Sequence, residues 1–420
     1  MPRSARHPTV SLKPRREAPL LAGHAWVFSG AIHQLSRPAE PGEIVDVRAA
    51  EGAFIGRGYY HPRTDIAVRL LTRDPDETID AAFLRRIIRQ AAMLREALDY
   101  DRTNAFRLIN SEGDGLPGVI IDSYAGYLVA QISTAGMERL REPLVQALVE
   151  DMQPRGVLLR NDASGRAREG LRREPPAVVA GEIPEQIEIC EHGLRFLVDP
   201  RLGQKTGFFL DQRDKRLALQ KYATGRNVLN CFSYTSAFGV YAAVTSPQTR
   251  VTSVDTSAPA LEAARANFAL NGLDPERHAF VAADVFDFLE AALERGERYD
   301  VVVLDPPAFA KSQGARIQAL RAYRRLNTLG MQALEPGGIL LSCSCSGAVS
   351  LDDLLFQYPR SGSYQKSSSP AAPGAILPSA AQRVGRKVQL LEVFGHGFDH
   401  PINLAMPETA YLKAVFCRLR

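Results

Sequence analysis

The chain has 420 residues, of which 45% are hydrophobic and 23% are charged, and its formal net charge is +4 at pH 7. This composition is that of folded globular proteins and excludes a wholly disordered or fibrous chain. The length exceeds what one hydrophobic core usually organises, so two or three domains are expected. The small positive charge permits a nucleic-acid partner without requiring one, because only clustered charge creates a strong field.

Membrane segments and metal motifs are both missing from the sequence. No apolar run reaches the roughly 18 residues needed to span a bilayer, and the polar N-terminus lacks the apolar core of a signal peptide. We therefore expect a cytoplasmic protein without a membrane partner. Five cysteines, an odd number with no CxxC pair, argue against a disulfide framework and a zinc site, so no metal is expected. A special cysteine would instead be catalytic.

Short β-runs broken by glycine turns dominate the first part of the chain. They lie at Trp26–Phe28, Glu43–Val47, Phe54–Tyr60 and Ala67–Leu71. Glycines inside such runs mark bulges or close backbone approach, which suits a compact barrel and would also admit an RNA backbone. We predict a small β-barrel domain over residues 1–73. A helix is expected next, over residues 81–98, where apolar residues recur at helical spacing.

A second unit of mixed type is predicted after this helix. Strands are expected at Phe106–Ile109, Gly118–Ile121 and Tyr127–Ile132, and a helix from Glu138 to Glu150. Strands and helices do not alternate regularly there, so this unit is not doubly wound. We assign a small α+β domain to residues 74–188.

From residue 194 onward, strands and helices alternate. Apolar strand cores lie at residues 228–229, 251–254, 280–281, 301–304 and 338–341. Alternation of this kind predicts an α/β fold with a mostly parallel sheet covered on both faces. We assign this domain to residues 189–420. Residues 357–378 interrupt the pattern with serine, proline and glycine and predict a flexible insertion.

Ligand-type side chains follow successive strands of the predicted sheet. Asp255 ends one strand, Asp284 follows the next, and Asn271 and Gly272 precede that second strand. Ligands of open α/β sheets collect at the carboxyl ends of the strands, where one carboxylate can accept hydrogen bonds from ribose hydroxyls and another from the adenine amine. These positions indicate an adenosine cofactor. The turn at residues 231–239 is not GxGxxG, which disfavours a dinucleotide.

An acid and two cysteines follow the next two strands. Asp305 precedes two prolines, whose stiff turn would hold its carboxyl group against a planar base. A thiolate that adds to C6 of cytosine makes C5 nucleophilic, so a cysteine beside an acid suits methylation of that carbon. Asp305 would stabilise the charge that builds on the ring. Cys343 and Cys345 are two residues apart on a strand and share a face, so both are candidates for the nucleophile.

Long stretches of the chain resemble the bacterial large-subunit ribosomal RNA cytosine-C5 methyltransferase I family, over nearly the whole length. They are residues 23–32 (GHAWVFSGAI), 107–118 (RLINSEGDGLPG), 204–213 (QKTGFFLDQR) and 230–238 (NCFSYTSAF). The resemblance implies a PUA domain, a small α+β domain and a Rossmann-like class I methyltransferase domain. It also implies S-adenosyl-L-methionine as cofactor and formation of 5-methylcytosine in 23S ribosomal RNA.

The same resemblance implies a nucleophile at Cys345 with Asp305 beside it. It further implies a cofactor site at the strand ends and the preceding loop, made of Gln212, Arg213, Asn230, Phe232, Tyr234, Thr235, Asp255, Asn271, Asp284 and Asp305. Segments 399–401 and 407–413 also match the family, and we expect them to close the sheet with two antiparallel strands. Two departures weaken the cofactor prediction: Ser236 replaces a glycine in the first cofactor turn, and residues 246–250 replace a glycine-rich step.

Two alternative functions stay open. An RNA base N-methyltransferase can also hold an amino group with an acid-Pro-Pro-Phe type of motif, and it needs no cysteine. A ribosome-assembly or RNA-binding factor with an idle methyltransferase domain is suggested by the N-terminal β-module and by Ser236. The sequence also leaves open a homodimer and the identity of the group that removes the C5 proton.

Overall fold

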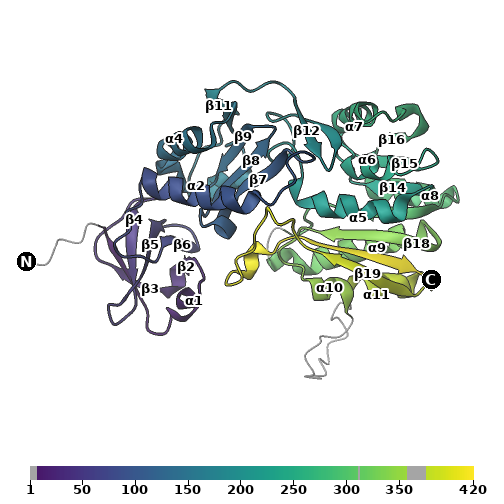
Figure 1. Ribbon diagram of the computed structural model, residues 1–420. Helices are drawn as coiled ribbons and strands as arrows, with labels where there is room; N and C mark the ends of the chain where they lie inside the picture. The colour runs from purple at the N-terminus through teal and green to yellow at the C-terminus, as the bar shows by residue number, and fades with distance from the viewer. Residues whose placement is uncertain (1–6, 311–312, 357–374) are drawn as a thin grey trace, which may run out of the picture. The chain divides into compact units, whose positions relative to one another are not determined.

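The computed structural model describes residues 7–310, 313–356 and 375–420 (Figure 1). The chain forms two compact units, each built from more than one segment. The first comprises Met1–Gly193, Val198–Leu210 and Phe398–Thr409, and the second comprises Leu194–Leu197, Asp211–Gly397 and Ala410–Arg420. Within the described residues, no helix has both the length and the apolar character needed to cross a membrane.

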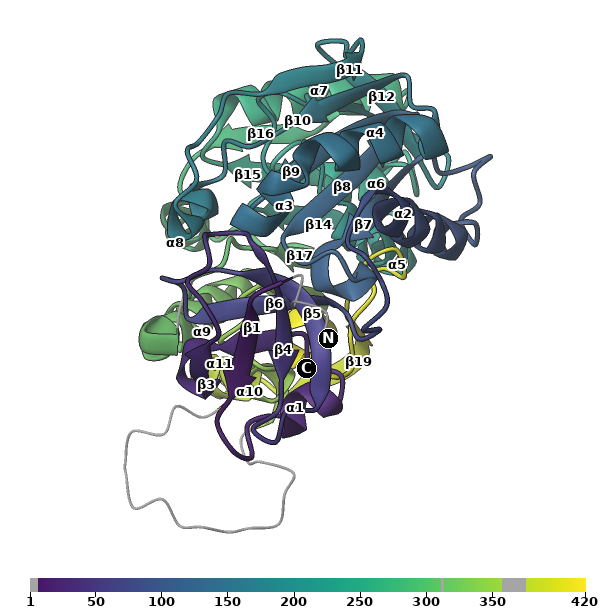
Figure 2. The same cartoon turned by 90° about the vertical axis from the view of Figure 1, so that its left-hand side faces the viewer.

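A six-stranded sheet in the order β2-β6-β5-β4-β1-β3 begins the first unit (Figure 2). Its elements are β1 (Thr9–Leu12), α1 (Ala18–Leu21), β2 (Trp26–Phe28), η1 (Ser29–Ala31), β3 (Ile32–Leu35), β4 (Ile44–Arg48), β5 (Phe54–Tyr60) and β6 (Ile66–Thr72). Alternate residues such as Val45 and Val47 point into one apolar core. A Cβ at Gly58 would lie 2.0 Å from the Arg69 carbonyl oxygen, so the expected close backbone approach is confirmed there.

The rest of the first unit contains a five-stranded sheet in the order β11-β10-β9-β8-β7. Its elements are α2 (Ala81–Arg95), β7 (Ala105–Asn110), η2 (Ser111–Asp114), β8 (Val119–Tyr124), β9 (Tyr127–Ile132), α3 (Ala135–Arg139), α4 (Arg141–Met152), β10 (Gly156–Leu159), η3 (Ser164–Glu169) and β11 (Ala177–Gly181). The Asp80 side chain caps α2 by accepting from the Phe83 amide. Leu84 and Ile88 of α2 share a core with Leu144 of α4.

A C-terminal segment belongs to this first unit, contrary to expectation. We predicted strands at residues 399–401 and 407–413 that close the methyltransferase sheet, and this prediction is wrong. The Asp399 carboxylate accepts from the Arg107 amide at 3.0 Å, and its carbonyl oxygen accepts from the Arg95 guanidinium at 2.7 Å. These buried bonds fix the segment as a loop, which ends in η7 (Pro407–Thr409).

The second unit holds a seven-stranded sheet in the order β16-β15-β14-β17-β18-β20-β19 (Figure 1). Its strands are β14 (Asn227–Cys231), β15 (Arg250–Asp255), β16 (Ala279–Ala282), β17 (Tyr299–Leu304), β18 (Leu334–Ser344), β19 (Val388–Phe394) and β20 (Lys413–Leu419). The first five are parallel, whereas β20 runs antiparallel to both β18 and β19. Two antiparallel strands therefore do close the sheet, but they are β19 and β20.

Helices cover both faces of this sheet, which confirms the predicted α/β class. They are α5 (Arg213–Ala223), α6 (Ala237–Ala243), α7 (Ala258–Leu270), α8 (Val285–Glu294), α9 (Arg316–Gln332), α10 (Leu351–Leu355) and α11 (Ile376–Arg383). Helices α5, α6 and α7 pack on one another in sequence, and α9 packs on both α8 and α11. Strands β12 (Ile187–Glu191) and β13 (Leu194–Val198) form a separate two-stranded sheet.

Most of the predicted insertion at 357–378 lies outside the described residues, which resume at 375. Its last part is helical, because α11 begins at Ile376. Ile376 and Leu377 are buried in apolar clusters shared with α9, so the prediction of a flexible loop is wrong for these residues. The division into domains 1–73, 74–188 and 189–420 remains a prediction.

Candidate active site

Strand register brings the predicted site residues to one edge of the sheet. In β14, Cys231 pairs with Val254 of β15 and with Leu304 of β17, and Leu304 pairs with Ser342 of β18. All four strands are parallel, so the next residues along them, which are Phe232, Asp255, Asp305 and Cys343, lie at the same edge of the sheet. The predicted convergence of residues 232, 255, 305 and 343 follows from this register.

The turn after β14 holds three residues other than glycine in the left-handed region. They are Phe232, Tyr234 and Ser236, with φ of 57°, 48° and 55°. Each such residue costs on the order of 1–3 kcal/mol, and this kind of strain clusters at functional sites. The Tyr234 amide donates to Asp255 Oδ2 at 2.8 Å, which ties the turn to the next strand.

Ser236 takes the conformation that a glycine would adopt without strain. Its hydroxyl is buried, lies 2.6 Å from the Ser253 hydroxyl and accepts from the Asn230 side-chain amide at 3.3 Å. These two bonds offset the backbone strain, so the departure from the family glycine is compensated locally.

We predict that Ser236→Ala destabilises the protein by about 1–3 kcal/mol, because it keeps the left-handed strain and leaves buried polar partners unsatisfied. Ser236→Gly loses the same bonds but also relieves the strain, so its loss should be smaller. Urea unfolding of both variants measures the difference. Equal stability of the alanine variant and the parent would show that the buried bonds contribute nothing.

Asp255 is the last residue of β15, and Asp284 follows β16. Asp255 is half-buried, and its Oδ1 accepts from the Ser257 amide at 2.9 Å while Oδ2 accepts from Tyr234. A carboxylate has about four acceptor positions, so Asp255 retains capacity for ribose hydroxyls. Asp284 is exposed and caps α8 through Oδ1, which accepts from the Phe286 amide at 2.8 Å. Its Oδ2 atom is left to accept from a ligand.

The side-chain amide of Asn271, a predicted cofactor contact, is hydrogen-bonded within the protein. Its oxygen accepts from the Arg195 amide at 2.9 Å, and its nitrogen donates to the carbonyl oxygens of Arg195 and Asn267. Both the oxygen and the nitrogen of the Asn271 side chain thus already have hydrogen-bond partners. One turn earlier, Asn267 donates to the carbonyl oxygen of Thr235 at 3.0 Å. Asn267, which the sequence did not single out, positions the cofactor turn.

Several buried polar atoms around the turn have no hydrogen-bond partner within the described part of the chain. They are Asn230 Oδ1, Ser233 Oγ and Gln212 Oε1. Buried polar groups in proteins are almost always hydrogen-bonded, so acceptors and hydroxyls left over at a strand-end edge suit a polar ligand. The amino, carboxylate and hydroxyl groups of S-adenosyl-L-methionine offer such partners. The residues present therefore fit this cofactor.

The start of α5 supplies buried polar groups to the same edge. Gln212 donates through Nε2 to Asp305 Oδ1 at 2.9 Å. The next residue, Arg213, is also buried. Lys215, which sequence reasoning missed, donates to the carbonyl oxygens of Asp211 and Gly395. Burial lowers the pKa of the Lys215 ammonium. Gln212, at the N-terminus of α5, thus fixes the orientation of the Asp305 carboxyl group.

The two cysteines at the end of β18 have different environments. Cys343 is 1% exposed, and burial together with the nearby Asp305 raises the pKa of its thiol well above the usual value. Cys343 therefore stays protonated and is a poor nucleophile. Cys345 is half-buried, and its Sγ lies 3.8 Å from the Pro306 carbonyl oxygen in the stiff turn after Asp305. Only Cys345 of this pair is open to a substrate.

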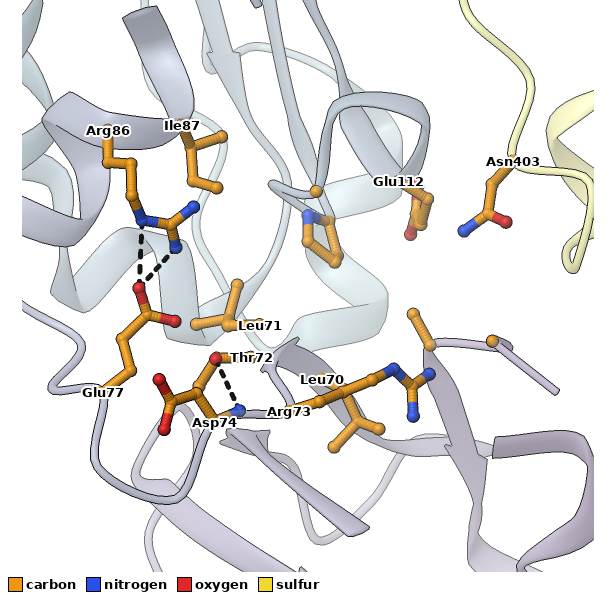
Figure 3. Close-up of a pocket in the computed structure, with 14 residues that line it drawn as sticks. Leu70, Leu71, Thr72, Arg73, Asp74, Glu77, Arg86, Ile87, Glu112 and Asn403 are labelled. Carbon is orange, nitrogen blue, oxygen red and sulfur yellow. Dashed lines mark hydrogen bonds and ion pairs between the residues drawn. The ribbon is translucent and has the colours of Figure 1, made fainter. Parts of the chain in front are cut away.

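A cavity of about 690 Å³ lies in the first unit, apart from these strand ends (Figure 3). The Arg86–Glu77 ion pair lies at one side, and Glu112 and Asn403 lie at the other. Arg73 lines the cavity and donates to the His24 carbonyl oxygen at 3.1 Å. No acid pairs with Arg73 among the residues that the structure describes. A guanidinium in this setting suits a phosphate.

Metal ligands do not gather in the described residues, where no three His, Cys, Asp or Glu side chains could hold an ion together. The site is instead a strand-end edge with a strained first turn, two acids for a nucleoside, and a cysteine beside a third acid. These features define an S-adenosylmethionine-dependent methyltransferase. A family model described in those terms matches residues 172–366, and a PUA-like domain model matches residues 10–73.

Similar proteins identify the family within this class of methyltransferases. The ribosomal RNA large subunit methyltransferase I of Yersinia pseudotuberculosis is 42% identical over 406 residues, covering 96% of this chain and 97% of the relative. Its Yersinia pestis counterpart has the same identity and coverage. The chain belongs to the ribosomal RNA large subunit methyltransferase I family, and its cofactor is S-adenosyl-L-methionine. The family predicted from the sequence is confirmed.

Solved structures support the fold. One described as a SAM-dependent methyltransferase from Streptococcus mutans has a TM-score of 0.80 at 23% identity, covering 98% of this chain and 99% of that chain. The structure of SMU.776 in complex with SAH matches with the same values. The predicted combination of a PUA-like domain and a Rossmann-like methyltransferase domain is therefore confirmed.

Proposed function

We propose that this methyltransferase acts in the cytoplasm on large-subunit (23S) ribosomal RNA and forms 5-methylcytosine through a covalent adduct to Cys345. The names of the Yersinia relatives support the substrate. The observation that carries the chemistry is the pair of cysteines, of which only Cys345 is open to a base, beside the turn that follows Asp305. An N-methyltransferase would have no use for a thiol in this place.

The chemistry divides between the cysteine and the acid. The Cys345 thiolate adds to C6 of the cytosine, which breaks the C5–C6 double bond and makes C5 nucleophilic. Bound S-adenosyl-L-methionine supplies the electrophilic methyl group. Asp305, oriented by Gln212, hydrogen-bonds the base and stabilises the charge that develops on the ring. Loss of the C5 proton from the methylated adduct then restores the double bond and expels the Cys345 sulfur as thiolate.

The cofactor site that we propose surrounds the strained turn. Asp255 accepts from the ribose hydroxyls and Asp284 accepts from the adenine amine, while Gln212 and Asn230 offer their unpaired oxygens to the amino group. Arg213, Phe232, Tyr234, Thr235 and Asp305 complete this set. Asn271 supports the site indirectly, without touching the cofactor, because its amide is already bonded to Arg195 of β13.

Nucleoside mass spectrometry of large-subunit ribosomal RNA tests this function. RNA from cells that lack the protein should lose one 5-methylcytosine, and a plasmid copy should restore it. Loss of an N-methylated base instead would favour the N-methyltransferase alternative. Unchanged RNA would favour the assembly factor with an idle domain, and calorimetry with S-adenosyl-L-methionine would then show no saturable heat.

The cavity in the first unit supports a role in RNA binding. We predict that Arg73→Ala weakens RNA binding about threefold to tenfold at low salt and lowers the salt dependence by roughly one counterion, because one phosphate contact is lost. Fluorescence anisotropy at several salt concentrations measures both quantities. Arg86→Ala is the matched control, since Arg86 is already paired with Glu77. An unchanged salt slope for Arg73→Ala would exclude a phosphate at this position.

A further inference from the structure

Lys413 is a half-buried cation that lies beside the turn containing Cys345. It is the first residue of β20 and pairs with Ser344 of β18 in the antiparallel register. Its Nζ donates to the Ser346 carbonyl oxygen at 2.7 Å and to the Tyr411 carbonyl oxygen at 2.9 Å. The ammonium group is therefore fixed against Ser346, the residue after Cys345, while the backbone of Lys413 pairs with Ser344, the residue before it.

The turn does not need a charged group to keep its shape. The Ser346 hydroxyl already accepts from the Ala310 amide at 3.3 Å and lies 3.1 Å from the Tyr323 hydroxyl. A neutral donor could bond the Ser346 carbonyl oxygen as well as an ammonium does. The use of lysine is also unfavourable in itself, because burial lowers the pKa of Lys413 while the neighbouring Cys345 and Asp353 raise it. The hydrogen bonds of the turn therefore do not by themselves require a charged donor at this position.

Charges around Cys345 come from several elements. Asp305 directly precedes Pro306, whose carbonyl oxygen lies 3.8 Å from Cys345 Sγ. Asp353 of α10 interacts electrostatically with Lys413, and Tyr323 of α9 interacts with Cys345. Acids beside a cysteine disfavour its thiolate, whereas a cation favours it. Lys413 interacts electrostatically with Cys345, and its positive charge opposes these groups.

We propose that Lys413 is a positioning residue that keeps Cys345 in the thiolate form through the positive charge of its ammonium group. The inference deepens the proposed function and rests on it. The proton of the Cys345 thiol leaves to solvent, and the ammonium keeps its own three protons. Lys413 therefore stabilises the sulfur anion before it attacks C6 and again when it leaves.

Alkylation of Cys345 by iodoacetamide as a function of pH tests the inference without RNA or cofactor. Peptide mass spectrometry separates the Cys345 signal from that of Cys190, which is also half-buried and serves as an internal reference. In Lys413→Met the midpoint of the curve of Cys345 alkylation rate against pH should move up by about one pH unit, which is a tenfold loss of rate near pH 7. The curve for Cys190 should be unchanged. Lys413→Arg keeps the charge and should keep the midpoint.

The outcomes separate this inference from the proposed function. An unmoved midpoint in Lys413→Met, or an equal shift in Lys413→Met and Lys413→Arg, would overturn the role of the charge. If Lys413→Met fails to fold, Lys413→Gln takes its place, with circular dichroism as the folding check. Failure of the proposed function would appear elsewhere, as methyl transfer that persists when Cys345 is replaced.

Discussion

Replacing Cys345 with alanine is expected to lower the rate of methyl transfer at least a thousandfold. The reason is that C5 of an aromatic cytosine has almost no nucleophilicity until a thiolate has added to C6, so no parallel route remains. The variant should bind S-adenosyl-L-methionine normally, because Cys345 directly follows β18 and does not belong to the strained turn after β14. Single-turnover transfer of a labelled methyl group to RNA measures the effect.

Cys343→Ala is the matched control for this prediction. Cys343 lies two residues earlier, within β18, but burial and Asp305 keep its thiol protonated. The variant should keep at least about a third of the rate and lose some stability, since a small buried side chain is shortened. A thousandfold loss in Cys343→Ala with activity retained in Cys345→Ala would reverse the assignment of the nucleophile.

Asp255→Ala is expected to weaken cofactor binding about a hundredfold. The change removes two charge-assisted acceptors for ribose hydroxyls, each worth about 1.5–3 kcal/mol, with part of this recovered by water. It also releases the Tyr234 amide, which ties the strained turn to β15. Isothermal titration with S-adenosyl-L-methionine gives the dissociation constant directly.

Asn271→Ala provides the contrast for Asp255→Ala. Its amide is bonded to Arg195 and Asn267, so the variant should lower the free energy of unfolding by about 1–2 kcal/mol and change cofactor affinity less than tenfold. A hundredfold loss of affinity in the Asn271 variant, at unchanged stability, would show that Asn271 contacts the cofactor itself. Normal affinity in Asp255→Ala would contradict the proposed nucleoside site.

The parts of the site that depend on strand order were predictable from the sequence. Apolar runs fix the strands, and parallel pairing then brings Asp255, Asp305 and the cysteines to one edge whatever the details of packing. The two cysteines could not be told apart in this way, because a period of two places both on the same face. Burial differs between them, and burial depends on residues such as Gln212 that are distant in the sequence.

Long-range contacts account for the remaining differences. The sequence of residues 399–401 does not by itself distinguish a loop from a strand. The loop conformation is set by hydrogen bonds that Arg95 and Arg107, some 300 residues earlier, donate to Asp399. The left-handed backbone of Ser236 is equally hidden, since serine rarely adopts it without partners such as Ser253. The register of β20 that places Lys413 beside Ser344 likewise appears only once the sheet is assembled.

Trapping the covalent complex tests the central claim most directly. RNA that carries 5-fluorocytosine cannot lose its C5 substituent after methyl transfer, so the cysteine adduct persists and is seen as a slow band on a denaturing gel. We expect this band with the parent protein and with Cys343→Ala, only when S-adenosyl-L-methionine is present, and we expect none with Cys345→Ala. Methyl transfer to RNA by the parent protein without any trapped adduct, or an adduct that survives in Cys345→Ala, would contradict the account.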